Sequence, residues 1–185
     1  IMLISGTLVL HGQLEFMRNK DLGYNKEQVV SIPLNGRKDS YAVLELLRDE
    51  LSQHPSILSV SGADNNLGLG KDGSLSSSAM GFDYKGKGIF TNALTVDYDY
   101  AKTLDIELKS GRLFNREFST DSLSLVINES MAKQLGEEDP LSIRIPMDDS
   151  VTYSVIGVIE DYNLQDVKKE VEPLTLFMNK DWDLY

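Results

Sequence analysis

The stretch Leu123-Ser-Leu-Val-Ile-Asn-Glu-Ser-Met-Ala-Lys-Gln-Leu-Gly136 predicts a strand that passes directly into a helix. Apolar and β-branched side chains dominate its first five residues, and such side chains favour a strand. Asn128 is a preferred residue before a helix, because its side chain can accept a backbone N–H of the first turn. Gly136 follows the predicted helix 129–135 and ends it, since glycine adopts the left-handed conformation of a helix C-terminus without strain.

Strands and helices alternate along the rest of the chain, which indicates a fold of mixed α and β structure. The predicted strand 153–159 is continuously apolar and is therefore expected to be buried. The segment 79–96 has the alternation of a hairpin, with its turn at 84–88. Further predicted elements are strands at 28–34, 57–63, 106–108, 143–145 and 174–178, and a short helix at 98–104 capped by Asp97.

The strongest predicted helix is Ser40–Gln53, whose apolar residues recur at helical spacing. Asp39 or Ser40 can cap it, and Pro55 stops it. Because this helix lies between two predicted strands, 28–34 and 57–63, we expect a βαβ-like unit in which the second strand lies beside the first.

The N-terminal segment 1–23 has the pattern of a helix that leaves a membrane. Its first fourteen residues carry no formal charge, and the chain then turns abruptly polar. The apolar run Ile1–Leu10 is shorter than the roughly 20 residues that span a bilayer. We expect the end of a transmembrane helix followed by a membrane-exit segment that ends at Gly23. The alternative is a buried strand or helix of the domain itself.

Composition excludes several classes of protein. The chain has 185 residues, with 18 Lys and Arg against 29 Asp and Glu, a formal net charge of -11. An acidic protein repels the phosphate backbone, so we expect no nucleic-acid partner. There are no cysteines and only two histidines, His11 and His54. Thiolate metal sites and a histidine-rich metal site are therefore excluded, and no metal ligands are predicted.

Motifs for catalysis or cofactor binding fail in their context. Gly68-Leu-Gly70-Lys-Asp-Gly73 matches the glycine pattern of dinucleotide sites, but no helix follows it to bind a pyrophosphate. No nucleophile elbow is present, and the carboxylate pairs Asp148-Asp149 and Glu160-Asp161 are of a kind common on surfaces. His54 lies near a helix end, where a cation-capable group is favoured. We therefore predict no catalytic residue and no cofactor.

The segment 64–78 is predicted to be a long loop, with three glycines, four serines and two asparagines. Its large apolar side chains are Leu67, Leu69 and Leu75. Leucines on a flexible loop suit docking onto another protein, where their burial is favourable. We predict that these three residues contact a partner or substrate. The alternative is that they pin the loop to the domain's own core.

Four motifs resemble the extracytoplasmic domain of an ABC transporter permease of the MacB/FtsX type. The first is Gln13-Leu-Glu-Phe-Met-Arg-Asn-Lys-Asp-Leu-Gly-Tyr-Asn-Lys-Glu-Gln-Val-Val30, which resembles the stretch through which the family leaves a membrane helix. The others, in chain order, are Val96–Tyr100 with Gly111–Phe114, Leu125–Gly136 with Asp139-Pro140, and Val155–Tyr162 with Glu172-Pro173-Leu174. The chain departs from the family at Leu141–Ile145, where a glycine–lysine usually precedes the strand.

This resemblance implies an α+β, two-lobed MacB-like periplasmic core domain. A Porter-like lobe would comprise residues 24–95 plus 170–178, and an inserted Sabre-like lobe would comprise 96–169. Both ends of the domain would return to the membrane on the same side. The first motif is most similar to the second extracytoplasmic domain of a permease that has two.

The resemblance also implies a non-catalytic role. In this family ATP is hydrolysed by a separate cytoplasmic subunit or domain, while the extracytoplasmic domain moves with the membrane helices and engages a periplasmic partner or substrate. The implied location is the inner membrane, with the domain facing the periplasm. Two rivals remain: a sensory or ligand-binding domain of a membrane receptor, which should show a pocket with convergent polar groups, and a soluble enzyme.

Overall fold

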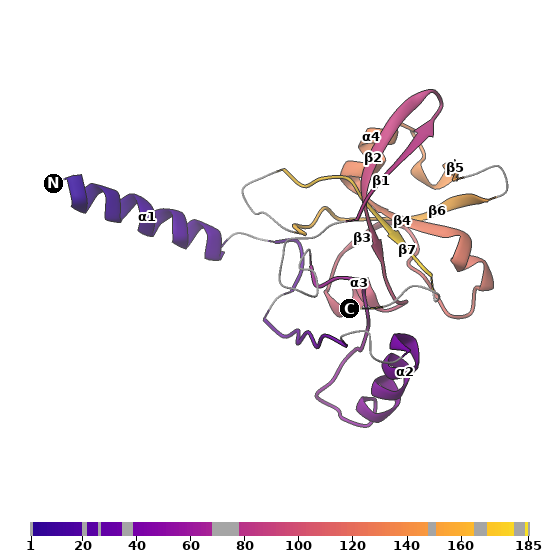
Figure 1. Cartoon of the computed structure of the whole chain (residues 1–185), viewed down its shortest axis with the longest axis horizontal. Helices are drawn as coiled ribbons and strands as arrows, with labels where there is room; N and C mark the ends of the chain where they lie inside the picture. The colour runs from indigo at the N-terminus through magenta and orange to yellow at the C-terminus, as the bar shows by residue number, and fades with distance from the viewer. Residues whose placement is uncertain are drawn as a thin grey trace.

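Seven strands form one mixed sheet in the order β1-β2-β7-β4-β6-β3, and β5 also pairs with β6 (Figure 1). The computed structural model describes residues 2–19, 22–25, 27–34, 39–67, 78–147, 151–164, 170–179 and 184. Its elements are α1 (Met2–Asn19), α2 (Ser40–Leu51), β1 (Ser78–Tyr84), β2 (Lys87–Thr95), α3 (Tyr100–Thr103), β3 (Leu108–Gly111), η1 (Ser119–Leu123), β4 (Ser124–Asn128), α4 (Glu129–Leu135), η2 (Pro140–Ser142), β5 (Arg144–Pro146), β6 (Thr152–Ile159) and β7 (Leu174–Phe177).

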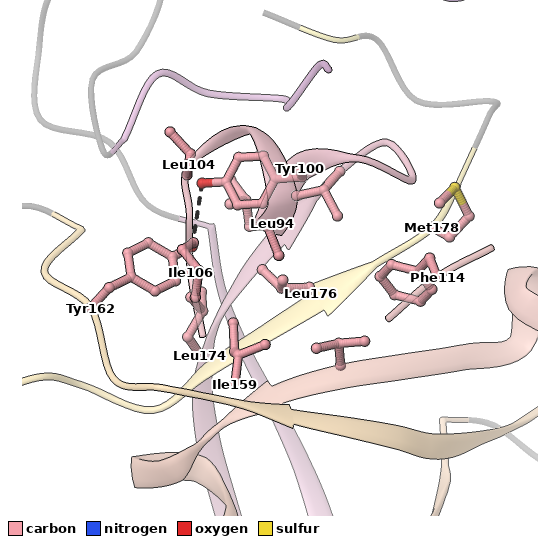
Figure 2. Close-up of a cluster of buried hydrophobic side chains, with 13 residues drawn as sticks. Leu94, Tyr100, Leu104, Ile106, Phe114, Ile159, Tyr162, Leu174, Leu176 and Met178 are labelled. Carbon is pink, nitrogen blue, oxygen red and sulfur yellow. Dashed lines mark hydrogen bonds between the residues drawn. The ribbon is translucent and has the colours of Figure 1, made fainter. Parts of the chain in front are cut away.

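The sheet divides the apolar core into two clusters, one on each face. Successive residues of a strand point to opposite faces, so Val126 of β4 joins one cluster while Leu125 and Ile127 join the other. The first cluster, shown in Figure 2, contains Leu94, Val96, Tyr100, Ala101, Leu104, Ile106, Phe114, Val126, Ile159, Tyr162, Leu174, Leu176 and Met178. The second contains Tyr84, Ile89, Leu125, Ile127, Met131, Leu135, Ile143, Ile145, Val155 and Val158.

The α+β class is confirmed, and the sheet runs across the predicted boundary between two lobes. Strand β7 pairs in parallel with β2 and antiparallel with β4, so strands assigned to different lobes are hydrogen-bonded neighbours. Both clusters also draw side chains from residues 24–95 and from residues 96–169. The described domain therefore has one continuous sheet where the resemblance implies two lobes.

The two strands predicted at 28–34 and 57–63 are not formed, and this part of the prediction was wrong. Both segments are extended, but neither belongs to a strand ladder, and Ala63 alone makes an isolated bridge, to Val96. Their apolar pattern favours a strand, but the β conformation is stabilised by cross-strand neighbours, and these segments have none within the described sheet. They do lie near each other, because both line the same small cavity.

The helix predicted at 40–53 is confirmed as α2, with its end at Leu51. The carboxylate of Asp39 accepts the backbone N–H groups of Tyr41 and Ala42, each at 3.1 Å, as the capping prediction requires. The helix predicted at 98–104 is shorter than expected. Its N-cap residue is Asp99, and the predicted cap, Asp97, instead pairs with an arginine of α2.

The local sequence signals for the hairpin and for α4 predicted these elements correctly. The hairpin β1–β2 turns at Lys85-Gly86, inside the predicted range, and both residues have positive φ angles. Asn128 caps α4 by accepting the N–H of Met131 at 3.0 Å, and Gly136 ends this helix with a φ of 73°. The strand predicted at 106–108 lies further along the chain, as β3.

Candidate functional site

Helix α1 projects away from the sheet (Figure 1), and the described side chains of residues 5–15 are all exposed. Leu8, Val9, Leu10 and Leu14 are each more than half exposed. A contiguous exposed apolar surface marks a site of contact with a protein or a membrane. Within the described ranges, no helix combines the length and the apolarity needed to cross a bilayer.

The N-terminal junction, residues 22–25, joins α1 to the domain by backbone contacts. The N–H of Asn25 donates to the carbonyl of Leu104 at 2.8 Å, and the carbonyl of Leu22 accepts the N–H of Asn163 at 2.8 Å. Gly23 has a φ of +76°, and a Cβ at this position would lie 2.6 Å from the backbone oxygen of Asp161. Only glycine fits both the left-handed conformation and this close approach.

Three tyrosines reinforce this junction from different parts of the sequence. The rings of Tyr24 and Tyr162 meet edge to face, with centroids 6.2 Å apart. The hydroxyls of Tyr162 and Tyr100 lie 3.3 Å apart and share a hydrogen bond, which Figure 2 shows as a dashed line. Burial raises the pKa of both hydroxyls above the ordinary value for tyrosine. Both therefore stay protonated, and the pair keeps a donor at every physiological pH.

The C-terminal junction, which we define as residues 178–179 and 184, rests on α2. Leu184 is buried, and its N–H donates to the hydroxyl of Ser40 at 2.9 Å. The hydroxyl of Tyr41 donates to the carbonyl of Asn179 at 3.0 Å. A Cβ added to Gly62 would lie 2.6 Å from the side chain of Leu184, so the two residues are packed tightly together.

Both junctions connect to one short segment of the chain, residues 97–104, the C-terminal junction through Gly62. The N-terminal junction bonds to Leu104, and Gly62, which packs on Leu184, accepts the N–H of Asp97 at 2.9 Å. The two junctions are therefore linked through one region of the domain, and the same-side position of the two ends stays a prediction from the four motifs.

The loop that carries the predicted partner contacts is described only at its start. Leu67 is half-buried and packs against the first cluster, with a φ of 48°. Leu69 and Leu75 lie outside the described residues. The carboxylate of Asp64 accepts the N–H of Thr95 through one oxygen at 3.2 Å, and burial raises the pKa of this group.

A small cavity of about 130 Å³ opens between the loop start and the two extended segments. Its lining includes Val29, Ile32, Ser61, Leu67 and Tyr100. Ligand pockets for small molecules usually measure about 300–1,000 Å³, so this cavity is small for such a role.

The residues considered for chemistry are described in part. Asp161 accepts the N–H and the hydroxyl of Ser130 at 2.9 and 2.7 Å, which fixes the start of α4. His11 and His54 are exposed. Among the described residues, no group of three or more acidic, histidine or cysteine side chains gathers as a metal site. The ranges 68–73 and 148–149 lie outside the described residues.

Comparison with known proteins identifies similar solved structures. No family model and no curated protein matches the sequence. The periplasmic region of MacB from Actinobacillus actinomycetemcomitans is 20% identical with a TM-score of 0.46, over 73% of this chain and 64% of that one. The extracellular domain of the noncanonic ABC-type transporter YknZ from Gram-positive bacteria is 17% identical with a TM-score of 0.48, over 73% of this chain and 62% of that one. This chain thus spans less than two thirds of the length of either structure.

Proposed function

We propose that this chain is the non-catalytic extracytoplasmic domain of an ABC transporter permease of the MacB/FtsX type. The observation that carries the proposal is the N-terminal junction. Tyr24, Tyr100 and Tyr162 come from three of the four motifs, and their rings and hydroxyls meet at the point where α1 joins the domain. The remaining motif, Leu125–Gly136, is connected to them through the hydrogen bonds between Ser130 and Asp161. The residues behind the resemblance thus gather where a membrane helix would connect.

In this proposal α1 is the outer end of a membrane helix. Its apolar side chains are exposed in the described domain and would be covered by lipid, which is favourable by about 0.8 kcal/mol for each buried CH₂ group. The domain then faces the periplasm from the inner membrane. ATP is hydrolysed by a separate cytoplasmic subunit or domain, and its effect arrives as a displacement of the membrane helices.

The domain would convert that displacement into engagement of a periplasmic partner or substrate. Its two ends connect to the same segment, so a relative movement of the connected helices acts on one region of the domain. The Porter-like and Sabre-like lobes stay a prediction. Since their strands share one sheet, we propose that they move as a single body. Leu69 and Leu75 on the loop 64–78 are the proposed partner contacts, while Leu67 packs against the first cluster.

Cysteine labelling tests the proposed membrane arrangement. The 185-residue sequence has no cysteine, so each introduced cysteine is the only thiol within it, and the parent protein gives the background labelling. In intact cells that produce the native protein, a membrane-impermeant maleimide should label Glu27→Cys, because this exposed residue would lie outside the membrane. Leu8→Cys should stay unlabelled until the protein is denatured in detergent. Equal labelling of both positions, or labelling of Glu27→Cys only after cell lysis, would refute the arrangement.

A further inference from the structure

Helix α2 is held to the domain by a small set of contacts. Of its twelve residues only Ser40 and Leu44 are buried. Leu46 points outward, with 61% of its surface exposed. In Figure 1 the helix stands apart from the sheet. Because Leu44 is its one buried apolar side chain, with four others partly buried, the polar contacts of α2 add substantially to how firmly the helix is held.

An ion pair joins α2 to the start of α3. The guanidinium of Arg48 pairs with the carboxylate of Asp97 and also donates to the carbonyl of Val60 at 3.3 Å. Asp97 is 1% exposed, so this pair is screened little by solvent. Arg116 approaches the same carboxylate oxygen at 3.3 Å and bonds Asp99 at 2.8 Å.

This ion pair lies between the two junctions. On one side, the backbone of Asp97 starts α3: its carbonyl accepts the N–H of Tyr100 at 3.2 Å, and the same short helix leads to Leu104 at the N-terminal junction. On the other side, Arg48 belongs to α2, whose first two residues bond to Asn179 and Leu184 of the C-terminal junction.

We propose that the Arg48–Asp97 ion pair is the tie that holds α2 at a fixed position relative to α3. With the tie in place, α2 moves together with α3. Without it, α2 moves independently of α3, while Met178 and Asn179 stay in place because they follow β7, whose last residue bonds to Val96. The role of this ion pair in transport rests on the proposed function. Its effect on the positions of α2 and α3 concerns the domain alone.

Distances between spin labels on α2 and α3 test the tie. Labels attached at Asp49→Cys and Lys102→Cys, both exposed positions, report the separation of the two helices in the 185-residue chain in detergent solution. We expect Asp97→Asn and Arg48→Met each to broaden the distance distribution at least twofold. Arg48→Met leaves Asp97 with Arg116, so this variant tests the tie even where Asp97→Asn fails to fold.

A matched control is available in a second buried ion pair. Asp121 is also 1% exposed and accepts two hydrogen bonds from Arg112, at 2.6 and 2.9 Å, and its partners Arg112 and Asn115 belong to neither junction. Asp121→Asn should leave the distribution between the labels unchanged. A distribution in Arg48→Met as narrow as in the parent chain overturns the tie. The tie is also overturned if Asp121→Asn broadens the distance distribution as much as Asp97→Asn does. The loss of any buried ion pair would then loosen the whole domain.

A separate measurement distinguishes the tie from the proposed function. In the intact permease, Arg48→Met should fail to replace the natural protein in cells that lack it. If the labels show that the tie is broken but the variant still replaces the natural protein, the role of the tie in transport is wrong while the tie stands. If the labels show no change, the tie is wrong whatever the permease does.

Discussion

Asp64 is held at the start of the loop by one of its two carboxylate oxygens. Oδ2 accepts the N–H of Thr95, while Oδ1 is buried without a hydrogen-bond partner in the described part of the chain. Burial raises the pKa of this carboxyl, and the bonds to Thr95 only partly oppose that effect. The charged form is therefore less stable in the folded chain than in the unfolded one.

Replacing Asp64 by asparagine should stabilise the domain at neutral pH. The amide oxygen keeps the bond to Thr95, and the buried charge is removed, so we expect a gain of about 0.5–1 kcal/mol at about pH 7. Because the pKa of Asp64 is raised in the folded chain, its carboxyl does not lower the stability below the unfolded pKa, where it is protonated in both states. It lowers the stability as the pH rises and the buried group becomes charged. The gain should therefore disappear by about pH 3, below the unfolded pKa, in urea unfolding. A gain of the same size at both pH values would show that the charge is not responsible.

The N-terminal junction is a short segment whose position depends on one glycine. Gly23 brings the backbone against Asp161 and Tyr162, and the bonds at Leu22 and Asn25 follow from that approach. Gly86 in the β1–β2 turn has nearly the same φ, 79°, but a Cβ there would meet nothing within 4 Å. The two glycines therefore differ in close contact and not in backbone conformation.

Gly23→Ala should open the junction, and Gly86→Ala should not. Both changes impose a positive φ on alanine at about 1–2 kcal/mol, but only the first adds a backbone clash. We expect the amides of Asn25 and Asn163 to exchange hydrogen at least about tenfold faster in Gly23→Ala, with no change in Gly86→Ala. Similar exchange at these amides in the two variants would mean that the close approach does not hold the junction.

The whole domain has one sheet with a core on each face, and the loop 64–78 leaves it next to the segment to which both junctions connect. Leu67, at the described start of the loop, already packs on the first cluster. The described start of the loop therefore lies near Leu104, to which the N-terminal junction bonds. This arrangement suits a domain that links a partner to membrane helices.

Serine substitutions separate anchoring from partner contact along the loop. Leu67→Ser should lower the stability of the domain by about 1–2 kcal/mol, since a half-buried leucine contacts the core. Leu69→Ser and Leu75→Ser should change it by less than about 0.5 kcal/mol, as surface substitutions do. The same two variants of the intact permease should replace the natural protein poorly in cells that lack it. A marked fall in melting temperature for either would identify that leucine as core and end its role as a partner contact.

Elements whose signals lie within a few residues could be predicted from the sequence. The helix α2 with its Asp39 cap, the turn at Lys85-Gly86, and α4 between Asn128 and Gly136 all form where they were predicted. Capping and turn formation involve side chains and backbone groups close together in the chain, so they are largely independent of the rest of the fold.

Everything that depends on distant neighbours was decided by the tertiary structure. The segments 28–34 and 57–63 have the residues of strands but no ladder, because the sheet pairs other strands with one another. Asp97 was expected to cap a helix, and Arg48 binds its carboxylate instead. The sequence by itself determined the local elements and the motifs. Packing between residues more than a hundred positions apart, such as Tyr24 on Tyr162, decided where the domain joins α1, since such contacts form only once the whole sheet brings them together.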